Sequence, residues 1–433
     1  MTSSSSRSLT GSAGKWINAG IAPIAELFHF FHFQATLRRL SIIQGSGRSQ
    51  HLVPTAVNRV LAEIREAQAG GRTVVSLMRG EPDFDTPAHI VEAAARAMKA
   101  GRTRYPDNRG EMPLREAVAA KLARDNGITY DPGSEILVTT GATLGIYVAL
   151  MAVVNDGDEV LLPDPIYDAY RSPIALAGGC ARPVRSSIDD GRFTLTADAI
   201  ESALTSKSRV LLLNTPWNPV GTVMRRHELE AIADLVIRRG LTLLSDEIYE
   251  AITYNGSTHL SPAALAPEAK AHTIVINSLS KTYAMTGWRV GYCAAPAPIT
   301  QAMFLHLQQA SRGPATFIQD AAAVALTGPQ DAVADMRTEY AGRRQRVLAA
   351  LASVRRVRVL APEGGFFAMV DARDTGVLSD EIRKRLLLDA GVAVIHGAAY
   401  GPGGEGTLRV SFASGGETLT RGLDRLREGL GAL

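Results

Sequence analysis

In this chain of 433 residues, the clearest candidate for a reactive side chain is a lysine flanked by residues with hydroxyl groups. Lys281 lies in the segment Ser278-Leu-Ser-Lys-Thr, directly after an apolar stretch, and Arg289 follows eight residues later. A lysine amine forms an imine only when it is partly uncharged, and burial or a neighbouring cation lowers its pKa enough for that. The pattern indicates a nucleophilic lysine, and a solvated loop lysine is the alternative.

An acidic residue follows another apolar run. Asp246 and Tyr249 belong to Ser-Asp-Glu-Ile-Tyr, which comes at the end of the apolar segment 241–245. In parallel sheets, ligands bind beyond the carboxyl ends of the strands, which predicts that Asp246 faces a ligand. An aspartate after a strand also serves as a helix N-cap, and this structural role is the alternative.

Two further segments have the chemistry of anion binding. Gly141, Ala142 and Thr143 join an apolar strand to an apolar helix, so free backbone N–H groups and the helix dipole would point at an anion. The segment lacks the Gly-Lys-Ser/Thr of a nucleotide P-loop, and a simple helix cap is the alternative. Arg409 lies within the apolar run Thr-Leu-Arg-Val-Ser-Phe, where an unpaired charge is costly. A planar guanidinium binds carboxylates with two hydrogen bonds, and a buried structural ion pair is the rival interpretation.

These segments resemble the class I/II aminotransferases, pyridoxal-phosphate (PLP) enzymes of fold type I similar to aspartate aminotransferase. The segment around Lys281 resembles the family's Schiff-base lysine motif, and Asn214-Thr-Pro-Trp-Asn-Pro-Val-Gly221 resembles its N-x-P-x-N-P-x-G loop. The resemblance extends from about Val57 to the C-terminus. It implies an α/β fold with a large, mostly parallel-sheet domain and a smaller α+β domain.

The resemblance also implies roles in binding the cofactor. Lys281 would hold PLP as a Schiff base and act as the general base, while Asp246 keeps the pyridine nitrogen protonated. Tyr249 and Asn218 would donate to the phenolic oxygen, and Tyr167, in Pro-Ile-Tyr-Asp-Ala-Tyr, would stack on the ring unless it is only a core tyrosine. The implied phosphate ligands are Gly141, Ala142, Thr143, Ser278, Arg289 and, from a neighbouring subunit of a homodimer, Tyr105.

Substrate contacts follow from the same resemblance. Arg409, Asn218 and a backbone donor at Gly80 would bind the substrate's carboxylate. A dicarboxylate substrate needs a second cation, for which Arg79 is a candidate. The family usually has Pro-Gly where this chain has His396-Gly, in a loop near the substrate, so the side-chain preference stays open.

The implied function is transfer of an amino group from an L-amino acid to a 2-oxo acid by a ping-pong mechanism, in amino-acid metabolism and biosynthesis. A C–S β-lyase or another PLP reaction on the same scaffold is the alternative. A PLP-sensing transcription regulator would need a basic DNA-binding domain upstream, and the first 50 residues lack its charge and length.

The apolar pattern predicts the elements that position these residues. Apolar strands separated by helices indicate a mostly parallel sheet covered on both faces. Preceding it, helices are expected at 54–69, 88–100 and 113–126 and a strand at 74–78. In the middle of the chain, strands are expected at 136–139, 160–163, 210–214, 241–245, 273–277 and 290–294, with helices at 144–154 and 226–239. Beyond residue 314, helices at 331–354, 379–389 and 417–430 and strands at 357–360, 366–371 and 408–412 indicate an α+β unit.

The predicted divisions are an N-terminal extension (1–53), an N-terminal part of the small domain with an arm (54–90), a large PLP-binding domain (91–315) and a C-terminal small domain (316–433). The extension is rich in Ser, Gly and Arg with one acid, Glu26. We expect it to be disordered or to reflect a mis-assigned start, with an organellar transit peptide as the alternative.

Composition narrows the classes of protein. The net charge of +3 and the absence of long Lys/Arg runs argue against nucleic acid as a partner, and polar residues interrupt the apolar stretch 16–33, which argues against a membrane span. The two cysteines, Cys180 and Cys293, lack neighbours at metal-ligand spacing. We therefore expect no metal site and a cytoplasmic, reducing compartment.

Overall fold

The apolar segments in the middle of the chain pair into a seven-stranded sheet in the computed structural model, which describes residues 46–50 and 52–433. In spatial order, its strands are β2 (Ile136–Thr139), β10 (Gly291–Ala294), β9 (Thr273–Ser278), β8 (Thr242–Asp246), β7 (Ser208–Asn214), β3 (Glu159–Asp164) and β4 (Cys180–Arg185). Only β10 of these strands is antiparallel to its neighbours, so the predicted mostly parallel sheet is confirmed.

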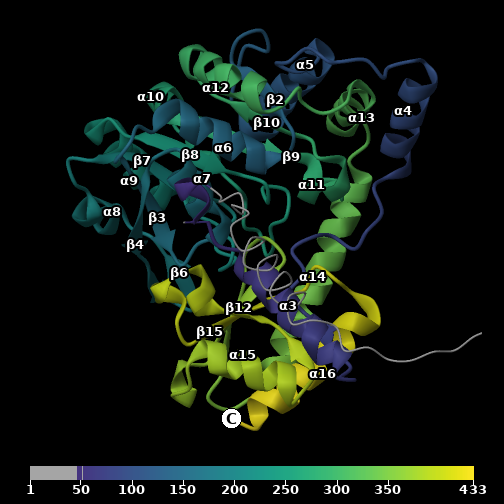
Figure 1. The fold of residues 1–433 in the computed structure, drawn as a ribbon, viewed down its shortest axis with the longest axis vertical. Helices are drawn as coiled ribbons and strands as arrows, with labels where there is room; N and C mark the ends of the chain where they lie inside the picture. Colours follow the sequence, from purple (N-terminus) through teal and green to yellow (C-terminus); the bar gives the residue numbers. More distant parts are fainter. Residues whose placement is uncertain (1–45, 51) are drawn as a thin grey trace, which may run out of the picture. The chain divides into compact units, whose positions relative to one another are not determined.

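Both faces of this sheet are covered, as the continuous apolar strands predict. Alternate residues of β2 enter different cores: Leu137 packs in one, while Ile136 and Val138 pack in the other. Helices α6 (Ala142–Val153) and α12 (Ala297–Ala310) lie on one side, and α4 (Ala88–Lys99), α5 (Met112–Lys121) and α13 (Thr316–Thr327) on the other (Figure 1). Helices α7 (Arg171–Leu176), α8 (Ala197–Ala203) and α9 (Arg226–Arg239) pack into the same core as α6, α10 (Pro267–His272) contacts α9, and α11 (Leu279–Thr282) packs into the core on the other face.

A four-stranded antiparallel sheet follows in the chain. Its spatial order is β11 (Arg358–Leu360), β12 (Phe367–Asp371), β15 (Thr407–Ser411) and β14 (Ile395–His396). It packs with α14 (Asp331–Leu351), α15 (Ser379–Leu388) and α16 (Gly416–Gly431) around a separate apolar core. The α+β character expected beyond residue 314 is confirmed, and the domain boundaries at 90 and 315 stay a prediction.

In the N-terminal part of the compact unit 53–433, Leu77 joins this second core, while Val60 and Ile64 form a smaller apolar cluster with Leu387 of α15 and Ile395 of β14. Helix α3 (Ala56–Ala69) begins close to the predicted position, and β1 (Val75–Ser76) pairs in parallel with β13 (Val392–Ala393). The helix predicted at 113–126 is α5 followed by a π-helical turn, Leu122–Asn126.

The structure adds elements that the pattern did not predict: α8, α12, α13, β4, β13, β14 and the hairpin of β5 (Ser187–Asp189) and β6 (Arg192–Thr194). Exposed side chains in β4 and alanine-rich sequence in α13 obscure the periodicity on which the prediction relied.

The N-terminal unit ends at Leu52. Within it the structure describes α2 (Gly47–Gln50), and the predictions for residues 1–45 lie outside the described residues. Across residues 46–50 and 52–433, no helix has both the length and the apolar character needed to span a bilayer.

The loop that carries Tyr105 is held against β2 by a close contact, which generates a stability prediction. Gly110 has φ +101°, and a methyl group added there would overlap the side chain of Val138. We expect Gly110→Ala to lower the free energy of unfolding by about 1–3 kcal/mol more than Gly127→Ala, because the first change also overpacks the core. Gly127 also has a positive φ (+69°) but no neighbour within 4 Å. Urea unfolding of the two variants tests this, and equal losses would contradict it.

Candidate active site

Lys281 lies in α11, just beyond the end of β9. Its half-buried Nζ donates a hydrogen bond to the carbonyl oxygen of Gly80 at 2.6 Å. Burial lowers the pKa of Lys281 to about 8; the charges of Arg289 and Arg409 lower it as well, and Glu81 opposes them. The amine is therefore partly uncharged near neutral pH, as a nucleophile or base requires.

Asp246 ends β8 and is 2% exposed. The hydroxyl group of Tyr170 donates a hydrogen bond to Oδ2 of Asp246, with 2.6 Å between the two oxygens. Burial raises the pKa of Asp246 to about 6, against the hydrogen bond from Tyr170, which lowers it. Turns follow Asp246, and the next helical segment begins at Pro262, so the N-cap interpretation of this residue is wrong.

The loop after β7 is fixed by its first asparagine. Asn214 donates from Nδ2 to the backbone oxygen of Asp246 at 2.9 Å and accepts from the backbone N–H of Asn218 at 2.8 Å. These bonds place Asn218 beside Arg409, whose Nη1 donates to Oδ1 of Asn218 at 3.3 Å. Both asparagines line the cavity, but Asn214 holds the loop in place and Asn218 contacts Arg409.

A turn with positive φ separates β2 from α6. Gly141 has φ +80°, and a Cβ added there would lie 2.5 Å from Nη2 of Arg289. Arg289 itself has φ +53° and donates to the backbone oxygen of Thr286 at 2.9 Å. The start of α6 and the guanidinium thus face one another, and Ser278 lines the same cavity. This cradle of N–H groups and positive charge fits a phosphate.

Arg409 projects from the middle of β15 and is 2% exposed. Its Nη2 donates to the oxygen of Met78 at 2.9 Å, and its guanidinium lies 4.3 Å from the ring centroid of Phe367 and 5.1 Å from that of Tyr400. Across residues 46–50 and 52–433, no carboxylate lies within 4 Å of it and its Nε has no hydrogen-bond partner. The structural ion-pair interpretation is therefore wrong for the described part of the chain, and the charge is available to an anion.

One cavity of about 1360 Å³ collects most of the predicted site. The predicted residues that line it are Gly80, Ala142, Thr143, Tyr167, Asn218, Asp246, Tyr249, Ser278, Lys281, Arg289 and Arg409. Gly141 shapes the turn without lining the cavity, and Tyr105 lies outside it with 88% of its surface exposed.

The cavity wall suits a flat ring. Tyr249 is 3% exposed and packs edge-on against Phe366 and Phe367, and burial raises its pKa. Tyr167 packs edge-on against Tyr170 at 5.5 Å between centroids. With the carboxyl group of Asp246 and the phosphate cradle, these residues fit PLP.

The sequence interpretation missed three residues of this site and misplaced one. Tyr170, Phe367 and Tyr400 support Asp246 and Arg409; Tyr170 stands three residues after Tyr167, which is the only sequence signal for any of them. His396 does not line the cavity: its Nδ1 lies 3.5 Å from an oxygen of Asp380. His396 itself therefore makes no contact in the cavity, and the substrate preference that this departure from Pro-Gly left open stays open.

Comparisons with known proteins agree with this geometry. Residues 72–426 match the model of the family described as aminotransferase class I and II. The aspartate aminotransferase of Bacillus sp. (strain YM-2) is 36% identical over 386 residues, which are 88% of this chain and 97% of that protein. Aromatic-amino-acid aminotransferase 2 of Thermococcus litoralis is 38% identical over the same shares.

Solved structures show the same likeness. The aspartate aminotransferase from Thermus thermophilus with maleate superimposes with a TM-score of 0.83 at 34% identity, covering 90% of this chain and 100% of that one. The aspartate aminotransferase from Rhizobium meliloti gives a TM-score of 0.85 at 32% identity over 90% and 99% of the two chains.

The hydrogen bond from Tyr170 to Asp246 generates a pH prediction. The bond stabilises the ionised carboxylate, so Tyr170→Phe should raise the pKa of Asp246 further. Since the ionised carboxylate of Asp246 would pair with the protonated ring nitrogen of PLP, we expect the acid-side pH midpoint of PLP affinity to move up by about one pH unit, which corresponds to the loss of roughly one charged hydrogen bond. Titration of the apoprotein with PLP at several pH values measures this.

Tyr130→Phe is the matched control. Tyr130 is also buried, and its hydroxyl has no hydrogen-bond partner among the residues that the structure describes. An unchanged midpoint in Tyr170→Phe, or the same shift in both variants, would contradict the prediction.

Proposed function

Since the chain belongs to the class I and II aminotransferase family, it is a PLP enzyme that transfers amino groups, and we propose that Lys281 is its cofactor-binding lysine and its general base. The position of its amine in the cavity supports this, as does its lowered pKa. When bound, PLP supplies an aldehyde that takes up the amino group and a ring that withdraws electrons from the substrate's Cα.

The other predicted residues would hold the cofactor. Asp246, supported by Tyr170, would accept a hydrogen bond from the protonated ring nitrogen, and Tyr249 and Asn218 would donate to the phenolic oxygen. Tyr167 would stack on the ring. The phosphate would bind Ala142, Thr143, Ser278 and Arg289 at the turn that Gly141 permits.

One observation carries the proposal for the substrate: the buried Arg409 has no carboxylate partner among the described residues and lines the same cavity as the amine of Lys281. We propose that its guanidinium binds the α-carboxylate of the amino acid, with help from Asn218. The N–H of Gly80 is unpaired within residues 46–50 and 52–433, and it supplies a further donor. This anchoring orients Cα so that the Lys281 amine removes its proton and returns it in the ping-pong half-reaction with the oxo acid.

We further propose that dicarboxylates such as aspartate are substrates and that Arg79 meets their second carboxylate. Arg79 lines the cavity next to Gly80, whose oxygen bonds Lys281, and its side chain is 63% exposed. Its charge partner is Glu81, one oxygen of which also accepts from Thr286 at 3.3 Å. The names of two similar aspartate aminotransferases and the maleate in one similar structure support this choice.

We also propose a homodimer in which the exposed Tyr105 reaches the phosphate of the neighbouring copy. The free state of Cys180 and Cys293 supports a reducing, cytoplasmic compartment. We also propose that the chain forms a large domain from residues 91–315 and a small domain from residues 54–90 and 316–433.

Covalent labelling tests the role of Lys281. Borohydride reduction of the PLP-loaded protein should add the cofactor's mass to the peptide that contains Lys281, and Lys281→Ala should lower amino transfer at least about a thousandfold, as loss of a general base does. Peptide mass spectrometry and an oxo-acid-dependent transfer assay measure both. An unlabelled peptide would refute the proposal, and release of pyruvate and ammonia without an oxo acid would favour the β-lyase.

Substrate selection tests Arg79. In half-reactions measured without an oxo acid, as conversion of the bound PLP to pyridoxamine phosphate, Arg79→Gln should lower the second-order rate constant for aspartate about 10- to 100-fold, the value of one charged hydrogen bond, and leave that for alanine nearly unchanged. Arg421→Gln removes the same charge from another part of the cavity wall and should spare both substrates. Equal losses for aspartate and alanine in Arg79→Gln would contradict the assignment.

A further inference from the structure

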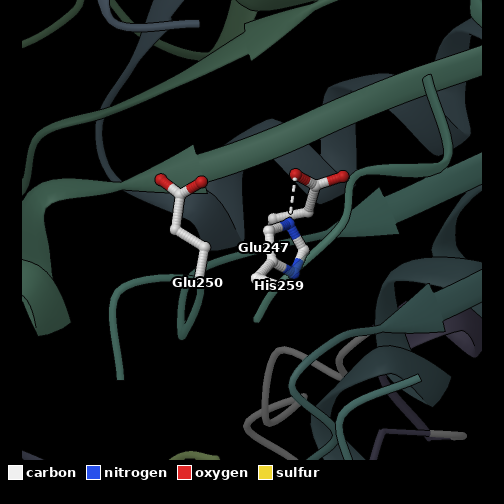
Figure 2. Close-up of side chains that lie close together, drawn as sticks. All are labelled: Glu247, Glu250 and His259. Atoms are coloured by element: carbon white, nitrogen blue, oxygen red, sulfur yellow. Dashed lines mark hydrogen bonds and ion pairs between the residues drawn. The ribbon is translucent and has the colours of Figure 1, made fainter. Parts of the chain in front are cut away.

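Two buried carboxylates lie behind the turn that carries Asp246 and Tyr249. Glu247 and Glu250 belong to the same turn, but neither lines the active-site cavity. Figure 2 shows both carboxylates beside His259, whose Nε2 lies 2.9 Å from Oε2 of Glu247. The side chains of Glu247 and Glu250 are 0% and 10% exposed. Such burial is costly for a carboxylate unless it is fully paired.

The carboxylate oxygens of Glu247 form their hydrogen bonds with residues nearby in the sequence. Its Oε1 accepts from the hydroxyls of Ser245 at 2.8 Å and Ser261 at 2.7 Å, and its Oε2 pairs with His259. All three partners lie between residues 245 and 261. This carboxylate therefore ties the turn to the segment that follows it in the chain and to no other part of the active site.

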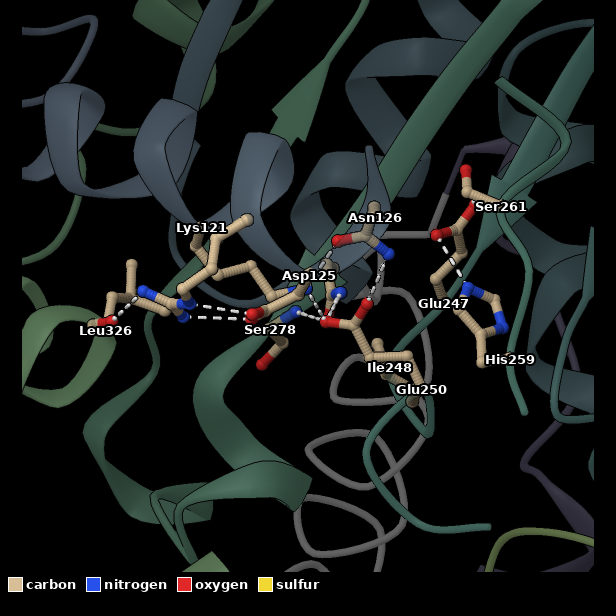
Figure 3. Close-up of polar contacts among 12 residues, drawn as sticks. Lys121, Asp125, Asn126, Glu247, Ile248, Glu250, His259, Ser261, Ser278 and Leu326 are labelled. Carbon is tan, nitrogen blue, oxygen red and sulfur yellow. Dashed lines mark hydrogen bonds and ion pairs between the residues drawn. The ribbon is translucent and has the colours of Figure 1, made fainter. Parts of the chain in front are cut away.

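Glu250 instead joins distant segments (Figure 3). It accepts from the ammonium group of Lys121 in α5, from Nδ2 of Asn126 at 2.9 Å and from Nδ2 of Asn277 in β9 at 2.6 Å. Burial would raise the pKa of Glu250, but the charges of Lys121 and His259 outweigh it, and the net direction is down. Glu250 is thus an ionised, fully paired carboxylate.

Asn277 connects Glu250 to the segment that carries Lys281. Its Oδ1 accepts from the backbone N–H of Ser278 at 2.7 Å, and Asn277 is 2% exposed. Ser278 is the N-cap of α11 and accepts from the N–H of Ser280, one residue before Lys281. A continuous path of hydrogen bonds therefore runs from the residue after Tyr249 to the first turn of the helix that carries Lys281.

The same cluster also has the composition of a metal site, since the ligand atoms of Glu247, Glu250 and His259 lie within 4.8 Å of one another. The oxygens of Glu250 already accept from an ammonium group and two amides, and those of Glu247 from two hydroxyls and the imidazole. The ammonium of Lys121 supplies the positive charge that a cation would bring, so the cluster is a paired hydrogen-bond network.

We propose that Glu250 and Asn277 are positioning residues, which clamp the Asp246–Tyr249 turn to the start of α11 and so set where the amine of Lys281 stands relative to Asp246. The proposal rests on the function proposed above. A displacement of about 1 Å between groups that act on one bound molecule can cost a hundredfold in rate. A clamp on the far side of both segments holds them without occupying the cavity.

Asn277→Ala tests the clamp. It removes the link to Ser278 but leaves Glu250 paired with Lys121 and Asn126, so no buried charge loses its partner. Ser261→Ala is the matched control, because it also removes one buried hydrogen bond to a carboxylate of this turn, contacts neither Asn277 nor Ser278, and leaves Glu247 paired with Ser245 and His259. If Asn277→Ala does not fold, Asn277→Ser is measured in its place.

The readouts are the PLP dissociation constant, the pH midpoint of the bound cofactor's absorbance, kcat and KM. We expect Asn277→Ala to weaken PLP binding about tenfold, as loss of one buried hydrogen bond does, and to shift the absorbance midpoint by about half a pH unit or more. It should lower kcat by about 10- to 100-fold with KM changed less than about threefold, because orientation rather than binding is lost. Ser261→Ala should change the PLP dissociation constant, kcat and KM by less than about threefold and leave the absorbance midpoint where it is in the parent protein.

An absorbance midpoint in Asn277→Ala equal to that of the parent protein would overturn the proposal. The proposal would also be overturned if both variants lost PLP affinity and kcat to the same extent, in proportion to the decrease in their melting temperatures. Failure of the parent protein to take up PLP at Lys281 would instead overturn the proposed function, and the mass of the borohydride-reduced peptide separates these two cases.

Discussion

Parallel strands that end at one edge of a sheet bring the residues after them to one place, and the candidate site depends on this constraint. β2, β9, β8, β7 and β3 run in one direction and end together. Asp246 ends β8, and Lys281 lies three residues beyond the end of β9. Segments more than 30 residues apart in the chain thus share one cavity because the sheet aligns the strands.

The turn after β8 separates two electrostatic environments. On the cavity side, Asp246 has a raised pKa and Lys281 a lowered one, and Arg409 has no carboxylate partner among the described residues. Behind the turn, Glu250 is paired with Lys121. The groups proposed to act on a ligand have shifted pKa values or a charge that is not neutralised by a partner among the described residues. The charges that support the backbone are instead neutralised by other groups of the protein.

Arg409, the proposed carboxylate anchor, comes from a different sheet than Lys281. Arg409 projects from β15, whose neighbours in register are Met369 of β12 and Ile395 of β14. Its guanidinium lies between Phe367 and Tyr400, which restrict its movement, and Asn218 from the loop after β7 touches it. The distance between the anchor and the reacting amine therefore depends on how the two sheets pack, which gives the interface between them a direct effect on chemistry.

The sequence by itself determined the strands of the central sheet except β4, and the residues at their ends, because continuous apolar runs and the residues after them are local features. Lys281 and Asp246 were predicted in this way and Arg409 as a charge inside an apolar run, and the motifs around them indicated the family. Only the tertiary structure decided that β10 runs antiparallel, since an apolar run reads the same in both directions. The tertiary structure alone showed the hydrogen bonds from Tyr170 to Asp246 and from Asn277 to Glu250. It also showed that Arg409 has no carboxylate partner among the described residues. Burial and pairing depend on side chains far away in the chain, and no local pattern encodes which of them will meet.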